Sequence, residues 1–258
     1  MRRASTCVAV LGLAMLALTS AASALPTVTF KAKAVPIKGF PHTGNIYGAG
    51  AAVEGEFTIK GNEYGGYSPP LIGVTVYLPK GVKLHTAGFP TCSAQIIEKI
   101  EPEKCPKQSS AGPPGKAKAF VVLGERVPET VSLESFYAPG GGINTIVLGH
   151  TPASIEIVST GTYSHLNGGG GFGPVATFKV PEVISVPGSA AASTESIVAK
   201  LGSAIKKGKK TLYYGTMPKK GECHGGLKVK AELTFAENGN ELTPETVTTN
   251  YTAPCPRK

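Results

Sequence analysis

The chain has 258 residues and a formal charge of +9 at pH 7, carried by 26 Lys and Arg against 17 acidic residues. Every acidic residue is Glu, there is no Trp, and Arg occurs at only four positions. These absences exclude a paired-Asp protease site and Ca²⁺ loops that need Asp at fixed places. They also leave few Arg for bidentate contacts with phosphate or guanine, so we expect no sequence-specific binding of nucleic acid.

The first 24 residues predict a signal peptide. Arg2 and Arg3 precede the apolar run CVAVLGLAMLAL, and the tripeptide ASA at 22–24 offers small residues for cleavage after Ala24. The apolar run is shorter than the roughly 20 residues that cross a bilayer as a helix. We therefore expect a secreted, extracellular protein that is not embedded in a membrane, with residues 25–258 forming the mature domain.

Alternation of apolar and polar residues between Gly and Pro predicts strands along the mature chain. TVTFKAKA places Val28 and Phe30 on one face, and PLIGVTVYLP, apolar on both faces, is typical of a central strand. One short helix is expected at 93–100, with Thr91 or Ser93 as its N-cap. The expected strands are 27–34, 51–61, 70–79, 116–124, 129–138, 143–149, 154–163, 174–184, 226–236 and 245–253.

The segment 194–206 fits two structures. Ile197, Leu201 and Ile205 have helical spacing, but they also fit a strand. We interpret the segment as a strand because its neighbours are strands, with a hairpin turn at 206–210. Ten to twelve strands at regular spacing then predict an all-β fold, an antiparallel β-sandwich. The sandwich is either single or divided into two lobes, with a boundary near 138–144.

Four cysteines remain after cleavage of the signal peptide: Cys92, Cys105, Cys223 and Cys255. An even number of cysteines in an exported chain predicts two disulfides, for which three pairings are open. We favour Cys92–Cys105 and Cys223–Cys255 because these pairs close the shorter loops. Zinc ligands usually come in closer pairs such as C-x₂₋₄-C, so we expect neither a metal nor another cofactor.

The tract GPPGKA at 112–117 fails as a phosphate-binding loop. The motif G-x-x-x-x-G-K-[ST] has Ser110 at its first position and Ala117 at its last, and the prolines lack the N–H groups that a phosphate needs. A turn is the simpler interpretation.

No catalytic residue is predicted. The five histidines are scattered and there is no G-x-S-x-G motif. Glu54 and Glu56 are the best carboxylate pair, since on one face of a strand they would lie about 6.5–7 Å apart. Inverting glycosidases use that spacing, yet such pairs are usually solvated. We expect a protein that is not an enzyme, and a glycoside hydrolase is the least favoured alternative.

Lysines cluster in the C-terminal half, next to tyrosines. A basic patch with aromatic rings would attract anionic or carbohydrate polymers of the cell wall, whereas the simpler interpretation is a solvated hairpin tip that protects strand edges. Tyr64 and Tyr67 are further candidates for stacking on sugars. We expect a structural, surface-associated or interaction role, with an extracellular protein or an anionic wall polymer as partner. The candidate polymer-binding residues are Lys206, Lys207, Lys209, Lys210, Tyr213 and Tyr214.

Short motifs give the chain a family resemblance. They are LPKGVKL, FPTCS followed by Cys105-Pro106, and PKKGEC followed by GGLKVKAELTF. On these motifs, most of the mature chain resembles a group of exported actinobacterial proteins with FPTCS…CP and PKxC segments, which has no established activity. The resemblance implies export, β structure and the favoured cysteine pairing, but no substrate. The additional Lys-Gly-Glu before Cys223 departs from the group without disturbing that pairing.

Overall fold

The computed structural model describes residues 25–40, 48–100, 102–166, 170–184, 187–237 and 240–255. The predicted signal peptide, residues 1–24, lies outside this part of the chain. Strands dominate the described residues, which contain a single short α-helix and three 3-10 turns. The all-β prediction is therefore confirmed.

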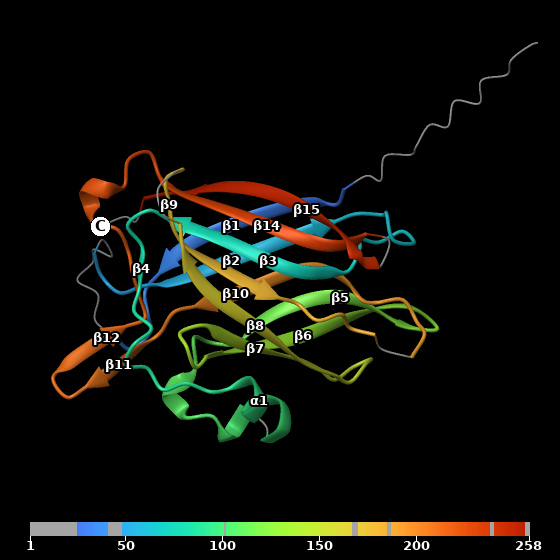
Figure 1. Ribbon diagram of the computed structural model, residues 1–258, viewed down its shortest axis with the longest axis horizontal. Helices are drawn as coiled ribbons and strands as arrows, with labels where there is room; N and C mark the ends of the chain where they lie inside the picture. The colour runs from blue at the N-terminus through green and yellow to red at the C-terminus, as the bar shows by residue number, and fades with distance from the viewer. Residues whose placement is uncertain are drawn as a thin grey trace, which may run out of the picture.

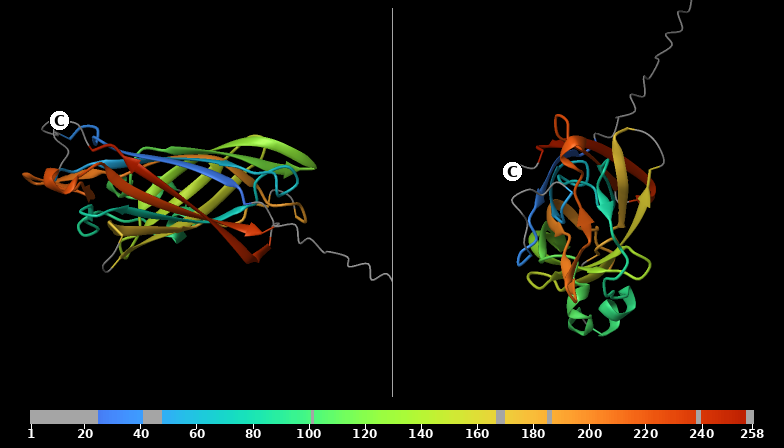
Figure 2. Two further views of the ribbon diagram at one scale, coloured as in Figure 1. Left: turned by 90° about the horizontal axis from the view of Figure 1, so that it is seen from above. Right: turned by 90° about the vertical axis from the view of Figure 1, so that its left-hand side faces the viewer.

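Eleven strands form one antiparallel sheet (Figure 1). The sheet curls over, so that its edge strands lie side by side and the Phe30 and Tyr251 rings meet with centroids 6.3 Å apart. One sheet thus supplies both layers of the sandwich-like fold, with the core between them (Figure 2). In sheet order the strands are β1 (Thr27–Val35), β2 (Ala52–Lys60), β10 (Ser193–Leu201), β5 (Gly115–Leu123), β6 (Glu125–Tyr137), β7 (Ile143–Gly149), β8 (Ile155–His165), β9 (Phe172–Lys179), β3 (Leu71–Pro79), β14 (Leu227–Glu237) and β15 (Asn240–Ala253).

The ambiguous segment 194–206 is a strand, as predicted. β10 pairs with β2 on one side and β5 on the other, and β11 (Ala204–Lys207) follows after a break. β11 forms a hairpin with β12 (Lys210–Tyr213), and β4 (Lys83–Leu84) pairs with β13 (Gly215–Thr216). A strand satisfies the backbone groups of both neighbouring strands, which a helix at this position could not do.

Residues 138–142 form the turn between β6 and β7. The Ala138 N–H donates to the Gly142 carbonyl at 2.9 Å, and Gly140 and Gly141 have φ of 84° and 98°. Left-handed backbone of this kind favours glycine. The segment considered as a lobe boundary therefore joins two neighbouring strands of one continuous sheet.

The helix α1 (Ala94–Ile100) and the turns η1 (Pro102–Lys104) and η2 (Lys107–Ser109) cover the outer face of the sheet. Ser93 is the N-cap, since its Oγ accepts the Ile96 N–H at 3.3 Å. The Cys92–Cys105 disulfide closes this segment, and Cys223–Cys255 joins the residues after η3 (Lys220–Glu222) to those after β15. Both predicted disulfides are confirmed.

Candidate apolar ligand cavity

The interior of the curled sheet contains a cavity of about 270 Å³. Its wall is built from the inward-facing positions of the strands, which the period-two alternation places on one side of the sheet. Aliphatic and aromatic side chains make up most of the lining. Examples from five different strands are Phe57, Val76, Leu133, Val147 and Ile157.

The cavity coincides with small residues on three adjacent strands. Gly55 of β2 and Ala199 of β10 are direct ladder partners, and Ala117 and Ala119 follow on β5. A Cβ built on Gly55 would approach the Phe30 ring only to 3.7 Å, which is ordinary van der Waals contact. Since no close backbone approach requires a glycine there, the small side chains leave open space.

The buried apolar side chains around the cavity do not form one continuous core. Within the described residues they fall into five separate clusters, whereas a domain usually has one contiguous core. The cavity is partly open, and its mostly hydrocarbon wall offers water few hydrogen-bond partners. A bound apolar molecule would therefore bury apolar surface that is otherwise left without packing partners.

Polar residues, among them Glu182, also line the cavity, and some of them are paired with other protein groups. The Ser135 and Thr145 hydroxyls lie 2.9 Å apart, and Ser159 Oγ donates to the Lys179 carbonyl at 2.5 Å. Groups that bond each other offer little to a ligand. The cavity therefore presents mainly hydrocarbon.

Three tyrosines form a cluster at one end of the cavity. The rings of Tyr137 and Tyr214 stack with centroids 4.0 Å apart, and the Tyr163 ring is 6.1 Å from Tyr214. Tyr214 Oη donates to the Gly141 carbonyl at 3.1 Å, while Tyr137 Oη accepts the Ser203 N–H at 3.0 Å. Burial raises the pKa of all three hydroxyls, that of Tyr214 to about 12. The cluster is therefore neutral at physiological pH.

Glu129 is a buried carboxyl that sequence reasoning missed. It is 2% exposed, and its Oε2 accepts the Ala153 N–H at 3.0 Å, whereas Oε1 has no hydrogen-bond partner within the described residues. Gly149 leaves room for Oε1, since a Cβ built there would lie 3.2 Å from it. One feature of the sequence could have indicated this burial. Glu129 lies between Val127 and Val131 in the alternation, on the face of the strand where apolar residues are expected.

The structure separates the predicted polymer-binding residues. Tyr214 is 3% exposed and belongs to the tyrosine cluster, so its predicted place on a binding surface is corrected. Tyr214 directly follows β12, and its inward-facing ring is held by stacking on Tyr137. Tyr213 packs over Gly50 and edge-on to Phe40. The four lysines are exposed on the β11–β12 hairpin: Lys206, Lys207, Lys209 and Lys210.

Tyr64 and Tyr67 hold an arginine. The guanidinium of Arg126 lies 4.7 Å from the centroid of each ring. It also donates to Ser193 Oγ at 2.8 Å. Because Arg126 covers one face of each ring, these tyrosines connect loop 61–70 to β6 and β10 rather than form an open sugar platform.

The Glu54–Glu56 pair lies on the outer face of β2. Glu54 forms ion pairs with Lys33 at 2.8 Å and Lys200 at 3.6 Å, and Glu56 is exposed. The hydrogen bond and charge of Lys33 lower the pKa of Glu54. A glycosidase acid needs a raised pKa, so this environment favours a structural ion pair.

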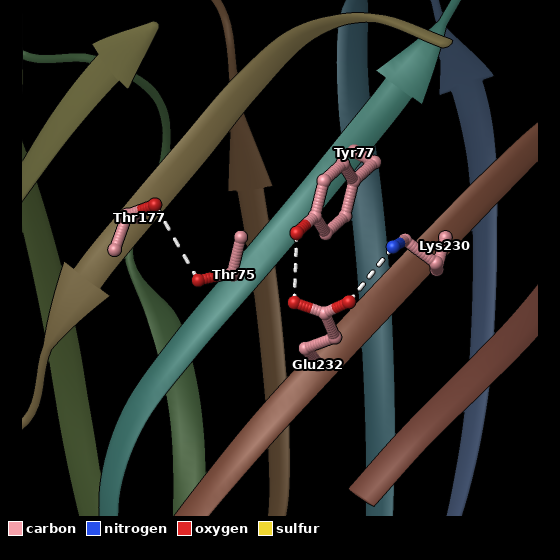
Figure 3. A network of polar contacts seen from close by, with 5 residues as sticks. All are labelled: Thr75, Tyr77, Thr177, Lys230 and Glu232. Atoms are coloured by element: carbon pink, nitrogen blue, oxygen red, sulfur yellow. Dashed lines mark hydrogen bonds and ion pairs between the residues drawn. The ribbon is translucent and has the colours of Figure 1, made fainter. Parts of the chain in front are cut away.

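A second polar network ties β3 to β14 on the outer face (Figure 3). Tyr77 Oη donates to Glu232 Oε2 and Lys230 Nζ to Oε1, both at 2.7 Å, and Lys230 Nζ lies 3.7 Å from the Tyr77 ring centroid. Burial alone would raise the pKa of Glu232, but the hydrogen bonds from Lys230 and Tyr77 outweigh it and the pKa is lowered. In the same view Thr75 donates to Thr177 at 3.4 Å, across β3 and β9. Both carboxylate oxygens of Glu232 already accept hydrogen bonds from protein groups, which favours a structural role for this network.

The part of the chain that the structure describes contains no group of three or more His, Cys, Asp or Glu that could hold a metal ion. It also contains no helix with the length and apolar character needed to cross a membrane. No protein-family model, no curated protein and no solved structure matches the chain.

Proposed function

We propose that this is an exported binding protein, not an enzyme, that holds an apolar molecule inside its curled sheet. The observation that carries the proposal is the cavity of about 270 Å³ with its hydrocarbon lining. Small-molecule sites are typically concave and mostly apolar, with a few polar groups. The two disulfides support export, because such bonds persist in oxidising compartments.

The size of the cavity sets the scale of the ligand. An apolar cavity of ~150 Å³ binds benzene, and the present cavity is nearly twice that volume. Residues from both ends of the strands line it, from Leu84 and Thr216 at one end to Val183 and Ala192 at the other. An elongated hydrocarbon, such as a lipid chain, suits this shape better than a compact polar molecule.

The proposal is tested by measuring what the mature, oxidised protein binds. Solvent extraction and mass spectrometry would identify apolar molecules that copurify, and titration with an environment-sensitive apolar dye would give an affinity. Ala199→Leu places three more carbons in the cavity and is expected to weaken dye binding at least tenfold. Val198→Leu is the matched control, because Val198 lies on the same strand, faces outward and is 41% exposed.

Retained dye affinity in Ala199→Leu would place the dye elsewhere on the protein and refute the cavity as its site. Failure of the wild-type protein to bind any dye or lipid chain would end the proposal. Circular dichroism of each variant separates lost binding from lost folding.

A further inference from the structure

Basic charge is concentrated in one segment of the chain. Residues 196–221 contain seven lysines and no acidic residue. Four of these lysines are exposed at the tip of the β11–β12 hairpin, on both sides of Gly208. Like charges at such short spacing repel one another, so clustering these lysines does not stabilise the fold.

The hairpin projects from one end of the molecule, the end that also carries β4 (Figures 1 and 2). We call this the hairpin end. Its base is fixed by buried Ala204 and Ile205, and by hydrogen bonds from the Tyr214 N–H to Ser203 O at 3.0 Å and from the His85 N–H to Tyr214 O at 2.7 Å. The lysines are therefore presented on an ordered support.

Within the described residues, the lysines with an acidic partner are Lys33, Lys200 and Lys230. None of them belongs to the hairpin tip. Protection of strand edges explains an occasional lysine, but it does not require four of them around one turn. Four uncompensated charges on a projecting element suit an external anionic surface.

The base of the hairpin is also a wall of the cavity. Tyr214 and Thr216, which follow β12, line the cavity together with Leu84 of β4. An anionic surface held by the hairpin would therefore lie next to the apolar interior.

We propose that the β11–β12 hairpin docks the protein on the surface of an anionic phospholipid membrane. Lysine ammonium groups attract anionic headgroups without the fixed geometry that arginine forks impose. A membrane is preferred to other polyanions because it combines anionic charge with apolar chains of the kind that the cavity accepts. This preference rests on the proposed function.

Each lysine near an anionic membrane contributes about 1 kcal/mol, or roughly a fivefold change in affinity, so losing four should weaken binding several-hundredfold. The test measures sedimentation of the mature protein with vesicles of phosphatidylglycerol and phosphatidylcholine in equal parts, and with pure phosphatidylcholine. One variant replaces the four hairpin lysines by Gln. The matched control replaces four exposed lysines on β1, β2 and β5, which removes the same total charge: Lys31, Lys60, Lys116 and Lys118.

The expected result is strong, salt-sensitive binding to the anionic vesicles that the hairpin variant loses and the control keeps. Equal losses in both variants would overturn the proposal, since net charge alone would then explain binding. Binding of the protein to poly(glycerol phosphate), together with no binding to the anionic vesicles, would also overturn the proposal, because the partner would then be a wall polymer. Dye binding without vesicles tests the cavity separately, so failure of docking and failure of the proposed function are distinguishable.

Discussion

Ala199→Leu should stabilise the ligand-free protein, because the added carbons enter open space. Ala199 lies on β10, retains some accessible surface and lines the cavity. Three further carbons at ~0.8 kcal/mol each, less the rotamer entropy of a buried Leu, give a gain of about 1.5 kcal/mol. Most small-to-large changes in a core have the opposite sign and cost roughly 1–3 kcal/mol.

Ala231→Leu is the control for the sign of this stability change. Ala231 lies on β14, also faces inward, but is 0% exposed and does not line the cavity. Urea unfolding of both variants, after extraction of any bound lipid, should show Ala199→Leu above the wild type and Ala231→Leu below it. The melting temperature of Ala199→Leu should rise by roughly 3–6 °C.

Destabilisation of both variants by similar amounts would refute the reasoning, because Ala199 would then face a packed core. An equal m-value for the variants and the wild type is required, since a changed m-value would report a different denatured state. Addition of ligand should stabilise the wild type more than Ala199→Leu.

Three further predictions concern stability. Burial raises the pKa of Tyr214 from 10 to about 12, so stability present below pH 10 should fall by about 2 kcal/mol by pH 12; alkaline unfolding of Tyr214→Phe should show a smaller loss. Glu232 has a lowered pKa, so its stabilisation is present above about pH 4.5 and lost as the pH falls; acid titration of Glu232→Gln should show a flatter decline. Replacing both cysteines of a disulfide by Ser should cost about 3 kcal/mol for Cys92–Cys105 and about 4 kcal/mol for Cys223–Cys255, which closes the longer loop. The urea midpoint should therefore be lower for the variant without Cys223–Cys255 than for the variant without Cys92–Cys105.

The strands were predictable because most of them bury one face and expose the other. Alternation in 27–34 coincides with β1, whose burial alternates along the strand, and the strand interpretation of 194–206 holds for β10 and β11. The helix was predictable from a local signal, the capping hydroxyl of Ser93. The disulfides followed from the number and spacing of four cysteines.

The cavity was not predictable from local pattern. Gly55 and Ala199 are far apart in the chain, and they become neighbours only because β10 inserts between β2 and β5. Nothing in either segment specifies that pairing. The different surroundings of Tyr213 and Tyr214 were unpredictable for a similar reason. They depend on where the β11–β12 ladder ends, which the sequence of the two neighbouring tyrosines does not indicate.

Both ends of the curled sheet are held by specific contacts, and the hairpin end brings the cavity close to the lysines. At the far end Arg126 lies between Tyr64 and Tyr67, and Glu129 accepts the Ala153 N–H, so the loops there are tied to β6. At the hairpin end the cavity wall includes the two-residue ladder of β4 and β13. That ladder is extended by backbone hydrogen bonds from the His85 N–H to Tyr214 O at 2.7 Å and from the Ala51 N–H to Gly215 O at 3.1 Å. A membrane held by the hairpin lysines would therefore lie next to an ordered wall of the cavity, with lipid chains outside it and the apolar lining inside it.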